Sequence, residues 1–236
     1  MLPKALLSHH SDFFRRACNS EFKEGIENRV YLPQDDPVEF DQFIEWMFLR
    51  KVKKFPSYRT IHLEVCAYIF ADKIVADKYA NYIMRLMHRR VAEMDRYGPD
   101  CFSIGFDTIK MVMDNTLKGS PLRSFFSDVL VKYWWKKRII KRKPNEKSLW
   151  NQLFREDEDL RNHLIYNLGN DKTKEATYSL EKYLIPKKER HSGATTPPDA
   201  VSHDGSFRNY EEWGEPAFLG PDWFSDKCLQ CQKPYV

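Results

Sequence analysis

Apolar residues recur at helical spacing along most of the first 168 residues, and the clearest pattern follows Asp36. Asp36 can cap a helix, Pro37 suits the first helical position, and Glu39 can complete a capping box. The apolar positions after them are three and four residues apart: Phe40, Phe43, Ile44, Met47 and Phe48. This pattern predicts a helix over 37–48, and Trp46 widens its apolar stripe enough to predict burial on more than one side.

The same periodicity predicts a series of further helices. They are two short helices within 3–19, and then helical segments at 61–70, 77–94, 106–117, 121–133 and 148–168. Ser11 is a suitable N-cap for the second short helix. The run Gly119-Ser120-Pro121 indicates that one helix ends there and another begins.

Between the second short helix and the capped helix the pattern changes twice. Residues 19–28 are polar and contain Gly25, which indicates a turn. Residues 30–32 follow with the sequence Val-Tyr-Leu and end at Pro33, which predicts a short strand. The N-terminal region is therefore predicted to be mainly helical with one short strand.

The helical pattern fades after residue 168, which divides the chain into three predicted parts. The first, 1–95, ends near the break Tyr97-Gly98-Pro99, and the second, 100–168, is a helical extension. The third, 169–236, is predicted to be a mostly disordered tail because Pro, Ser, Thr and charged residues replace the apolar ones. Within it, residues 210–224 are acidic and aromatic, and they either form a docking peptide or fold back on the helices.

Composition places the chain among globular proteins of the cytoplasm or nucleus. Of its 236 residues 42% are hydrophobic and 31% are charged, and its apolar runs are too short for a transmembrane helix. We therefore expect no membrane partner. The net charge of +4 is modest and does not by itself predict a nucleic-acid partner. Five cysteines at irregular spacing argue against a disulfide framework.

Several short segments, in their order and spacing, resemble a BTB/POZ domain of the fungal type. They are KALLSHHSDFF at 4–14, FKE at 22–24, the predicted strand at 30–33, the capped helix at 36–48, ADK at 71–73 and NYI at 81–83. The segment SPLR at 120–123 is similar to the part that follows the domain in fungal members. One departure is large. The family usually begins with a strand hairpin ahead of this point, and Pro3 stands where it usually has histidine. The resemblance is therefore to an N-terminally truncated member, which is either a genuine variant or a chain whose true start lies upstream of Met1.

The resemblance implies a fold and a function. The implied fold is mainly α (α+β): a BTB/POZ-like helical cluster with a reduced short sheet, then the helical extension and the flexible tail. The implied function is non-catalytic protein–protein interaction, either self-association as a homodimer or an adaptor or scaffold role, including that of a ubiquitin-ligase substrate adaptor. The alternative is a nuclear factor that associates with DNA and uses the basic cluster described below.

The resemblance also assigns candidate partner-binding residues. Those expected at a dimer interface are Leu6, Leu7, Phe13 and Phe14. Those expected to face a cullin scaffold are Phe48, Leu49 and the loop up to Tyr58. The simpler interpretation, which stays open for each of them, is that they are core residues, since aromatic pairs at helical spacing usually pack inside a domain.

One basic cluster stands out at 132–143, with the sequence KYWWKKRIIKRK. Seven of its twelve residues are basic, and Trp134 and Trp135 lie among them. The candidate residues are Lys136, Lys137, Arg138, Lys141, Arg142 and Lys143. The cluster is either a solvated helix end, a nuclear-import signal or a nucleic-acid site. Nucleic-acid binding would predict an affinity that falls steeply with salt.

We expect no catalytic residue and no cofactor. The sequence contains no glycine-rich phosphate loop and neither a G-x-S-x-G nor an H-E-x-x-H motif. Cys228 and Cys231 form a CxxC, which is half of a zinc site, but two further ligands at suitable spacing are lacking. No metal site is therefore predicted.

Overall fold

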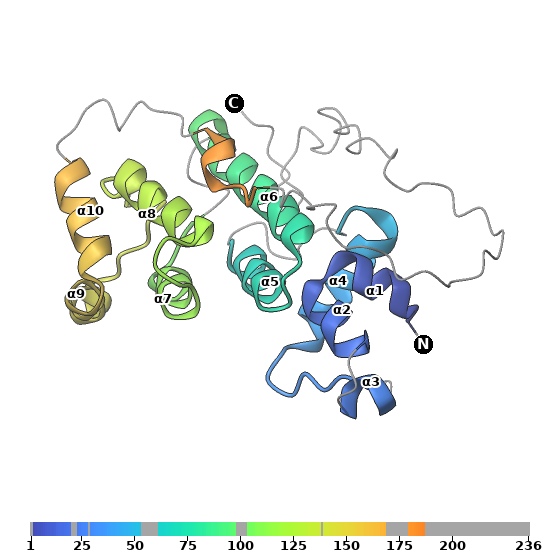
Figure 1. The fold of residues 1–236 in the computed structure, drawn as a ribbon. Coiled ribbons are helices and arrows are strands. Elements are labelled where there is room, and N and C mark those ends of the chain that lie inside the picture. Colours follow the sequence, from blue (N-terminus) through green and yellow to red (C-terminus); the bar gives the residue numbers. More distant parts are fainter. Residues whose placement is uncertain are drawn as a thin grey trace. The chain divides into compact units, whose positions relative to one another are not determined.

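The computed structural model describes residues 2–19, 23–27, 29–52, 61–97, 103–137, 139–168 and 179–186. Within these ranges the protein is helical, with ten α-helices and two 3₁₀ helices and no strand (Figure 1). The chain divides into two units, Met1–Ile185 and Pro186–Val236, and every described helix belongs to the first. The expectation of a mainly helical fold is confirmed. No helix among the described residues is long and apolar enough to cross a membrane.

Two short helices open the chain, α1 (Lys4–His10) and α2 (Asp12–Asn19). Ser11 lies between them and caps α2 as predicted, because its Oγ accepts a hydrogen bond from the Phe14 N–H at 3.1 Å. The same hydroxyl donates to the carbonyl oxygen of Ile74 at 2.5 Å. The N–H of Asp12 donates to the Val75 carbonyl at 3.1 Å. The start of α2 is therefore fixed to a turn more than sixty residues along the chain.

The segment between α2 and the capped helix differs from its prediction in two ways. The predicted turn contains a short helix, α3 (Lys23–Glu27), which includes Gly25. The predicted strand at 30–32 is wrong, and the short sheet of the implied fold is wrong with it for the described residues. A strand needs a neighbouring strand to complete its hydrogen bonds, and the described part of the chain offers none.

Helix α4 (Pro37–Leu49) confirms the capped helix. Asp36 Oδ1 accepts a hydrogen bond from the Val38 N–H at 2.9 Å, and Pro37 occupies the first helical position. The helix ends at Arg50, which adopts the left-handed conformation with φ 55° and donates its N–H to the Trp46 carbonyl at 2.8 Å.

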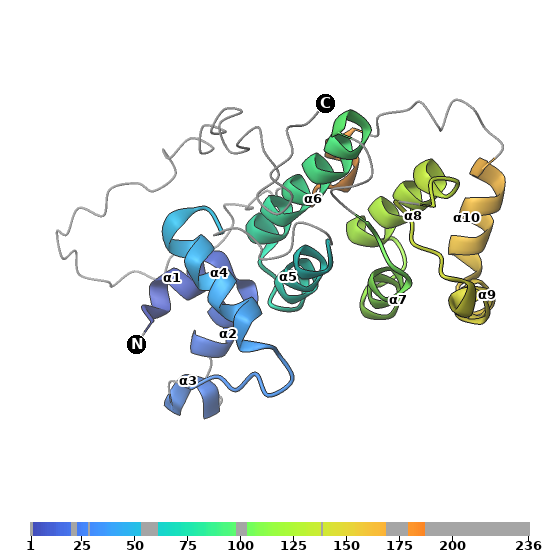
Figure 2. The ribbon, with the colours of Figure 1, turned by 180° about the vertical axis from the view of Figure 1, so that it is seen from behind.

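Helices α5 (His62–Lys73) and α6 (Asp77–Tyr97) lie side by side, between α1–α4 on one side and the later helices on the other (Figures 1 and 2). The core between them and α4 is aromatic. Its buried rings are Phe14, Phe43, Trp46, Phe70 and Tyr79. A buried ion pair joins Glu64 of α5 to Arg90 of α6.

Four further helices form a second layer: α7 (Phe106–Asn115), α8 (Pro121–Tyr133), α9 (Lys147–Glu156) and α10 (Glu158–Leu168). Helix α7 packs on α5, α8 and α9, and α10 packs on α8 and α9. As predicted, α8 begins at Pro121 after Gly119, which has φ 82°. The predicted helical segment 148–168 is two helices, because Asp157 interrupts it and caps α10 by accepting from the Leu160 N–H at 3.0 Å.

Two short elements complete the described structure. The 3₁₀ helix η2 (Pro144–Glu146) precedes α9, and η3 (Leu180–Tyr183) packs on α6 and α8. Figure 1 shows η3 in orange beside α6. The side-chain amide of Asn81 pairs with the backbone N–H and carbonyl of Ile185, at 2.8 and 2.9 Å. Residues 179–186 therefore pack on the helical layer, within the segment 169–236 that is predicted to be mostly disordered.

Candidate functional site

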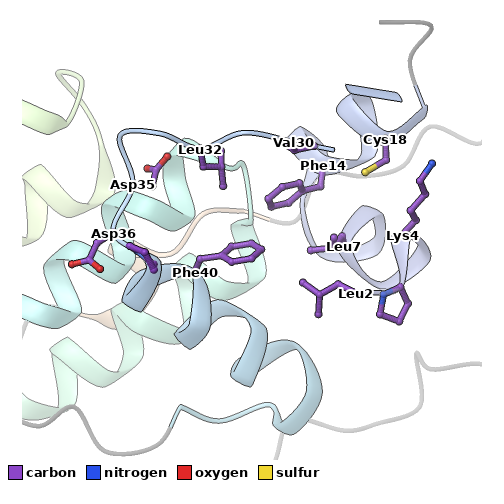
Figure 3. Close-up of a pocket in the computed structure, with 12 residues that line it drawn as sticks. Leu2, Lys4, Leu7, Phe14, Cys18, Val30, Leu32, Asp35, Asp36 and Phe40 are labelled. Atoms are coloured by element: carbon purple, nitrogen blue, oxygen red, sulfur yellow. The ribbon is translucent and has the colours of Figure 1, made fainter. Parts of the chain in front are cut away.

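An apolar groove of about 770 Å³ opens between α1, α2, the 30–36 segment and the first turn of α4 (Figure 3). Its lining residues are Leu2, Pro3, Lys4, Leu7, Phe14, Cys18, Val30, Leu32, Asp35, Asp36, Pro37 and Phe40. Most of these side chains are apolar, and only three of the twelve carry a charge. We call this feature the N-terminal groove.

The floor of the N-terminal groove continues into the protein core. Phe14 is only 2% exposed, and its ring centroid lies 6.0 Å from that of Phe40. Phe40 in turn contacts Phe70 of α5 edge to face, with ring centroids 6.3 Å apart. Because both rings are packed from behind by other aromatic residues, the floor is firmly supported.

The charged residues of the groove lie at its two ends. Figure 3 shows Lys4 at one end and Asp35 and Asp36 at the other, with the apolar side chains between them. Asp35 also accepts from Lys73 Nζ at 2.8 Å, and Asp36 caps α4. The groove therefore has a basic end, an apolar middle and an acidic end.

Residues 30–32 form one wall of the groove and remain extended although they are not a strand. Val30 and Leu32 line the groove, whereas Tyr31 between them is 70% exposed. Within the described part of the chain, the backbone N–H groups of these three residues donate no hydrogen bond. This wall therefore presents an extended edge whose donors are open to a further chain.

The candidate dimer residues and the candidate cullin-facing residues lie in different environments. Leu6, Leu7 and Phe13 are partly buried against the core, and only Leu7 of these three lines the groove. Phe14 is a core residue whose ring reaches the groove. At the other end of α4, Phe48 is 57% exposed and Leu49 is 51% exposed. Tyr58 lies outside the described residues.

His10, at the end of α1, is buried close to positive charge. Its Nδ1 lies 3.4 Å from Arg50 Nη1, and its ring contacts Trp46 edge to face at 5.2 Å between centroids. Burial lowers the pKa of His10 to about 3, and the positive charge of Arg50 and the neighbouring His9 and Lys78 contribute. His10 is therefore neutral at pH 7 and belongs to the packing behind the groove.

The basic cluster is not the end of a helix. Helix α8 ends at Tyr133, so only Lys132 lies in its last turn, and the remaining basic residues belong to the connection to η2. Lys136, Lys137, Lys141 and Lys143 are exposed, and the Arg142 guanidinium lies 4.6 Å from the centroid of the Trp134 ring. Arg138 lies outside the described residues. The interpretation as a solvated helix end therefore holds for Lys132 alone.

A buried carboxylate, Asp128 of α8, joins three elements. Its Oδ1 lies 2.9 Å from Nε2 of His163, and its Oδ2 accepts from Lys182 Nζ and from the Tyr183 hydroxyl, each at 2.6 Å. Burial would raise the pKa of Asp128, but these three hydrogen bonds outweigh it and hold the pKa below its usual range. The contacts fasten η3 and α10 to α8.

Asp128 and its partners His163 and Lys182 line a small hollow of about 210 Å³. A second polar contact, between Arg123 and Asp157, lies in the same hollow. Arg123 Nη2 also donates to the carbonyl oxygen of Thr116 at 3.2 Å. The carboxylate of Asp157 therefore both caps α10 and pairs with α8. Sequence reasoning missed this hollow, although the apolar residues Leu180, Tyr183, Leu184 and Ile185 signal, within the polar tail, that this segment packs.

No three His, Cys, Asp or Glu side chains among the described residues are placed to hold a metal ion. Cys18 lines the N-terminal groove, and Cys66 lies beside Met111 with sulfur atoms 3.6 Å apart. Burial, followed by the negative charge of Glu39, raises the pKa of Cys66 to about 11. Cys228, Cys231 and the acidic-aromatic segment 210–224 lie outside the described residues.

No protein-family model matches the chain, and no curated protein or solved structure matches it either.

Proposed function

We propose that this chain is a non-catalytic protein-interaction module of the BTB/POZ kind, and that it self-associates through the N-terminal groove. The observation that carries the proposal is the groove itself, which is apolar in the middle and oppositely charged at its ends. The occupant is a second copy of the same chain. The resemblance quoted above supports this choice, since such domains pair through the first helix and its surroundings.

Charge complementarity favours a symmetric pair. In a two-fold dimer both copies use the same surface. If residue i of the first copy contacts residue j of the second, then residue j of the first copy also contacts residue i of the second. When the groove is reversed, Lys4 of one copy faces Asp35 and Asp36 of the other, and the two apolar middles meet. Oppositely charged ends around an apolar centre are thus self-complementary.

The extended wall of the groove supports the same arrangement. An unpaired extended edge is a template for pairing with another chain, and the N–H groups of Val30, Tyr31 and Leu32 are such an edge within the described residues. Two such edges related by a two-fold axis run antiparallel, which is the geometry of an antiparallel ladder. The exposed Tyr31 ring would also be covered in this arrangement.

The first test places a charge in the apolar middle of the groove. Leu2 is partly exposed, so Leu2→Asp leaves the core intact. Burial of a carboxylate in an apolar contact is costly, and we therefore expect the dissociation constant of the dimer to rise more than tenfold. The measurement is sedimentation velocity over a range of protein concentrations. Val38→Asp is the matched control, because Val38 is exposed on α4 and does not line the groove.

The second test uses the charged ends. Lys4→Glu places like charges against Asp35 and Asp36 of the other copy and weakens association. Asp36→Ser removes one of those negative charges and keeps a side-chain oxygen that can cap α4. The double variant, Lys4→Glu with Asp36→Ser, should therefore associate more tightly than Lys4→Glu alone. Lys51→Glu and Asp41→Ser are controls of the same charge change at exposed positions outside the groove. A wild-type chain that stays monomeric at high concentration would refute self-association, and binding of another occupant by the monomer would reassign the groove.

A second function, recruitment of a cullin scaffold, is favoured by the end of α4. Phe48 and Leu49 are consecutive large apolar residues, and the side chains of both are exposed at the end of the helix. We propose Phe48→Ala with Leu49→Ala as the test, in a co-elution assay with a purified cullin scaffold. Because both residues are exposed, we expect the variant to keep its helical circular dichroism and its self-association, and to lose only its binding to the cullin scaffold. Co-elution that survives the double substitution would exclude this end of α4.

A further inference from the structure

The connection between α8 and η2 carries several exposed lysines and one exposed indole. Trp135, Lys136, Lys137 and Lys141 are among them, and we call these four residues the basic-aromatic surface. We propose that this surface binds single-stranded nucleic acid, with a base stacked on Trp135 and the lysine ammonium groups placed against backbone phosphates. This function is separate from the N-terminal groove and uses none of its residues.

The charge of the chain is concentrated at this connection. Residues 132–147 contain eight basic residues and one acidic residue, so the segment carries a net charge of +7. The whole chain carries +4, so the other residues together carry −3. The one acidic residue, Glu146, is engaged locally: its carboxylate pairs with Lys143 Nζ at 3.0 Å and accepts from the Lys143 N–H at 3.2 Å. A polyanion is therefore attracted to this segment rather than to the molecule as a whole.

The backbone that carries the surface is fixed from behind. Ile139 and Ile140 are buried, and Ile140 forms a parallel bridge with Ile104. In this bridge the Ile104 N–H donates to the Ile139 carbonyl at 2.7 Å, and the Lys141 N–H donates to the Ile104 carbonyl at 2.8 Å. The lysines thus project from an ordered turn, which reduces the entropy lost when a ligand binds.

Two adjacent tryptophans in this connection have opposite environments. Trp134 packs edge to face on Trp150 and Phe154 of α9, at 5.4 and 5.7 Å between centroids, and Arg142 lies over it. Trp135 is 66% exposed and is the only large apolar side chain exposed among the described residues of 132–147. Packing therefore accounts for Trp134 and not for Trp135. An exposed ring among ammonium groups is the usual composition of a surface on which unpaired bases stack.

Single strands fit this surface better than the other polyanions do. In a duplex the bases are stacked on each other and offer no free face to an indole ring, whereas a single strand does. A membrane surface would need a broader apolar area than one ring to hold the protein at the interface. The proposal is therefore specific to unpaired bases, and duplexes and vesicles serve as its alternatives.

The experiment measures anisotropy of fluorescein-labelled 15-nucleotide RNA and DNA strands of mixed sequence, titrated with the full chain. We expect binding at 50 mM salt that weakens about 20-fold at 200 mM, because about three phosphate contacts give a log–log slope of about −2 for single strands. Duplexes of the same sequence should bind at least several-fold more weakly. Vesicles containing phosphatidylserine, tested by co-sedimentation, should retain little protein.

Variants separate stacking from charge. Trp135→Ala should weaken single-strand binding about 5- to 150-fold, and Trp135→Phe should retain most of the affinity, because a ring is kept. Lys137→Ala with Lys141→Ala should reduce the magnitude of the salt slope by about 1.4. Arg16→Ala with Lys51→Ala is the matched control, because it removes two exposed positive charges far along the chain and should leave the slope unchanged.

Four results would overturn the proposal. The first two are the absence of binding to single-stranded RNA or DNA at 50 mM salt, and binding to duplexes as tight as to single strands. The other two are stronger retention of the protein on vesicles than on single strands, and a Trp135→Ala variant that binds single strands like the wild type. The last result would leave only a general attraction of polyanions to lysines. All substituted side chains are exposed, so unchanged circular dichroism is expected for every variant.

Discussion

The two halves of the described structure differ in their central contacts, although the first also contains the Glu64–Arg90 ion pair and the second the ring contacts of Trp134. In the half formed by α1–α6, the helices meet through rings, with Phe43 in contact with Phe14, Trp46, Phe70 and Tyr79 at centroid distances of 5.3 to 6.5 Å. In the half formed by α7–α10 and η3, buried polar groups join the elements, with Asp128 and Asp157 as the central carboxylates. The N-terminal groove of the first half is lined mostly by apolar side chains, and the hollow described in the second half is lined mainly by polar and charged ones.

The two kinds of contact suit the halves to different roles. Ring packing tolerates an unfilled apolar face, because nothing polar is left without a partner when the face is exposed. A buried carboxylate tolerates no such gap, because each lost hydrogen bond leaves a charge without compensation. The ring-packed half is therefore the one that can present an apolar interface, whereas the relative positions of the helices in the polar half are fixed by its buried hydrogen bonds.

The largest expected effect tests the ring-packed half. Phe43→Ala removes a ring that contacts four others, and we expect the free energy of unfolding to fall by about 3–5 kcal/mol. Urea unfolding followed by circular dichroism measures it. Phe48→Ala is the matched control on the same helix, because its ring is exposed, and its effect should stay within about 0.5 kcal/mol. Equal losses in the two variants would mean that ring packing does not hold this half together.

The second effect tests the polar half. Asp128→Asn removes the charge that Lys182 and Tyr183 donate to, and we expect a loss of about 3 kcal/mol. Hydrogen exchange should increase over α8, α10 and η3 before it increases over α1–α4. Asp114→Asn, in an exposed pair with Lys110, is the control and should cost less than about 1 kcal/mol. Exchange that increases uniformly along the chain would erase the distinction between the halves.

Local signals predict the helices well. Asp36 and Pro37 fix the start of α4, and Ser11 and Pro121 mark the starts of α2 and α8, because caps and helix-initiating prolines act within a few residues. The Ser120 side chain, expected as the cap of α8, makes no capping hydrogen bond. The prediction of a strand at 30–32 is wrong, because the sequence Val-Tyr-Leu cannot indicate whether a second strand lies beside it.

The groove and the Asp128 contacts could not be predicted because their parts are far apart in the sequence. Phe14 and Phe40 lie on different helices, and the start of α2 is fixed to the turn at Ile74, far along the chain. Asp128 and Tyr183 are 55 residues apart, and the segment between Leu168 and Ser179 carries no pattern that predicts their contact. Pairings of this kind depend on tertiary packing, on which local propensity gives no information.

The third effect uses pH to test the packing behind the groove. The pKa of His10 is lowered to about 3, first by burial and then by Arg50, so the unfolded chain binds a proton below about pH 6.5 that the folded chain does not. Stability therefore falls as pH falls, by about 1.4 kcal/mol per pH unit between about pH 6 and pH 4. The difference between wild type and His10→Gln isolates this proton, because the variant lacks the titrating group. Parallel stability curves for the two proteins would show that His10 titrates normally.

The smallest effect concerns the polar contact that fixes the start of α2 in the ring-packed half. Val75 has φ 52°, a left-handed conformation that is strained for a β-branched residue, yet its carbonyl and that of Ile74 accept the hydrogen bonds that fasten the start of α2. Asn adopts this conformation more readily, so Val75→Asn should raise the free energy of unfolding by about 1 kcal/mol. Val38→Asn, in the ordinary helical conformation of α4, is the control and should give no gain. Val75→Asn could instead destabilise the protein and weaken self-association. That result would mean that packing of the Val75 side chain, and not the backbone conformation of the turn, holds α1 and α2 in place.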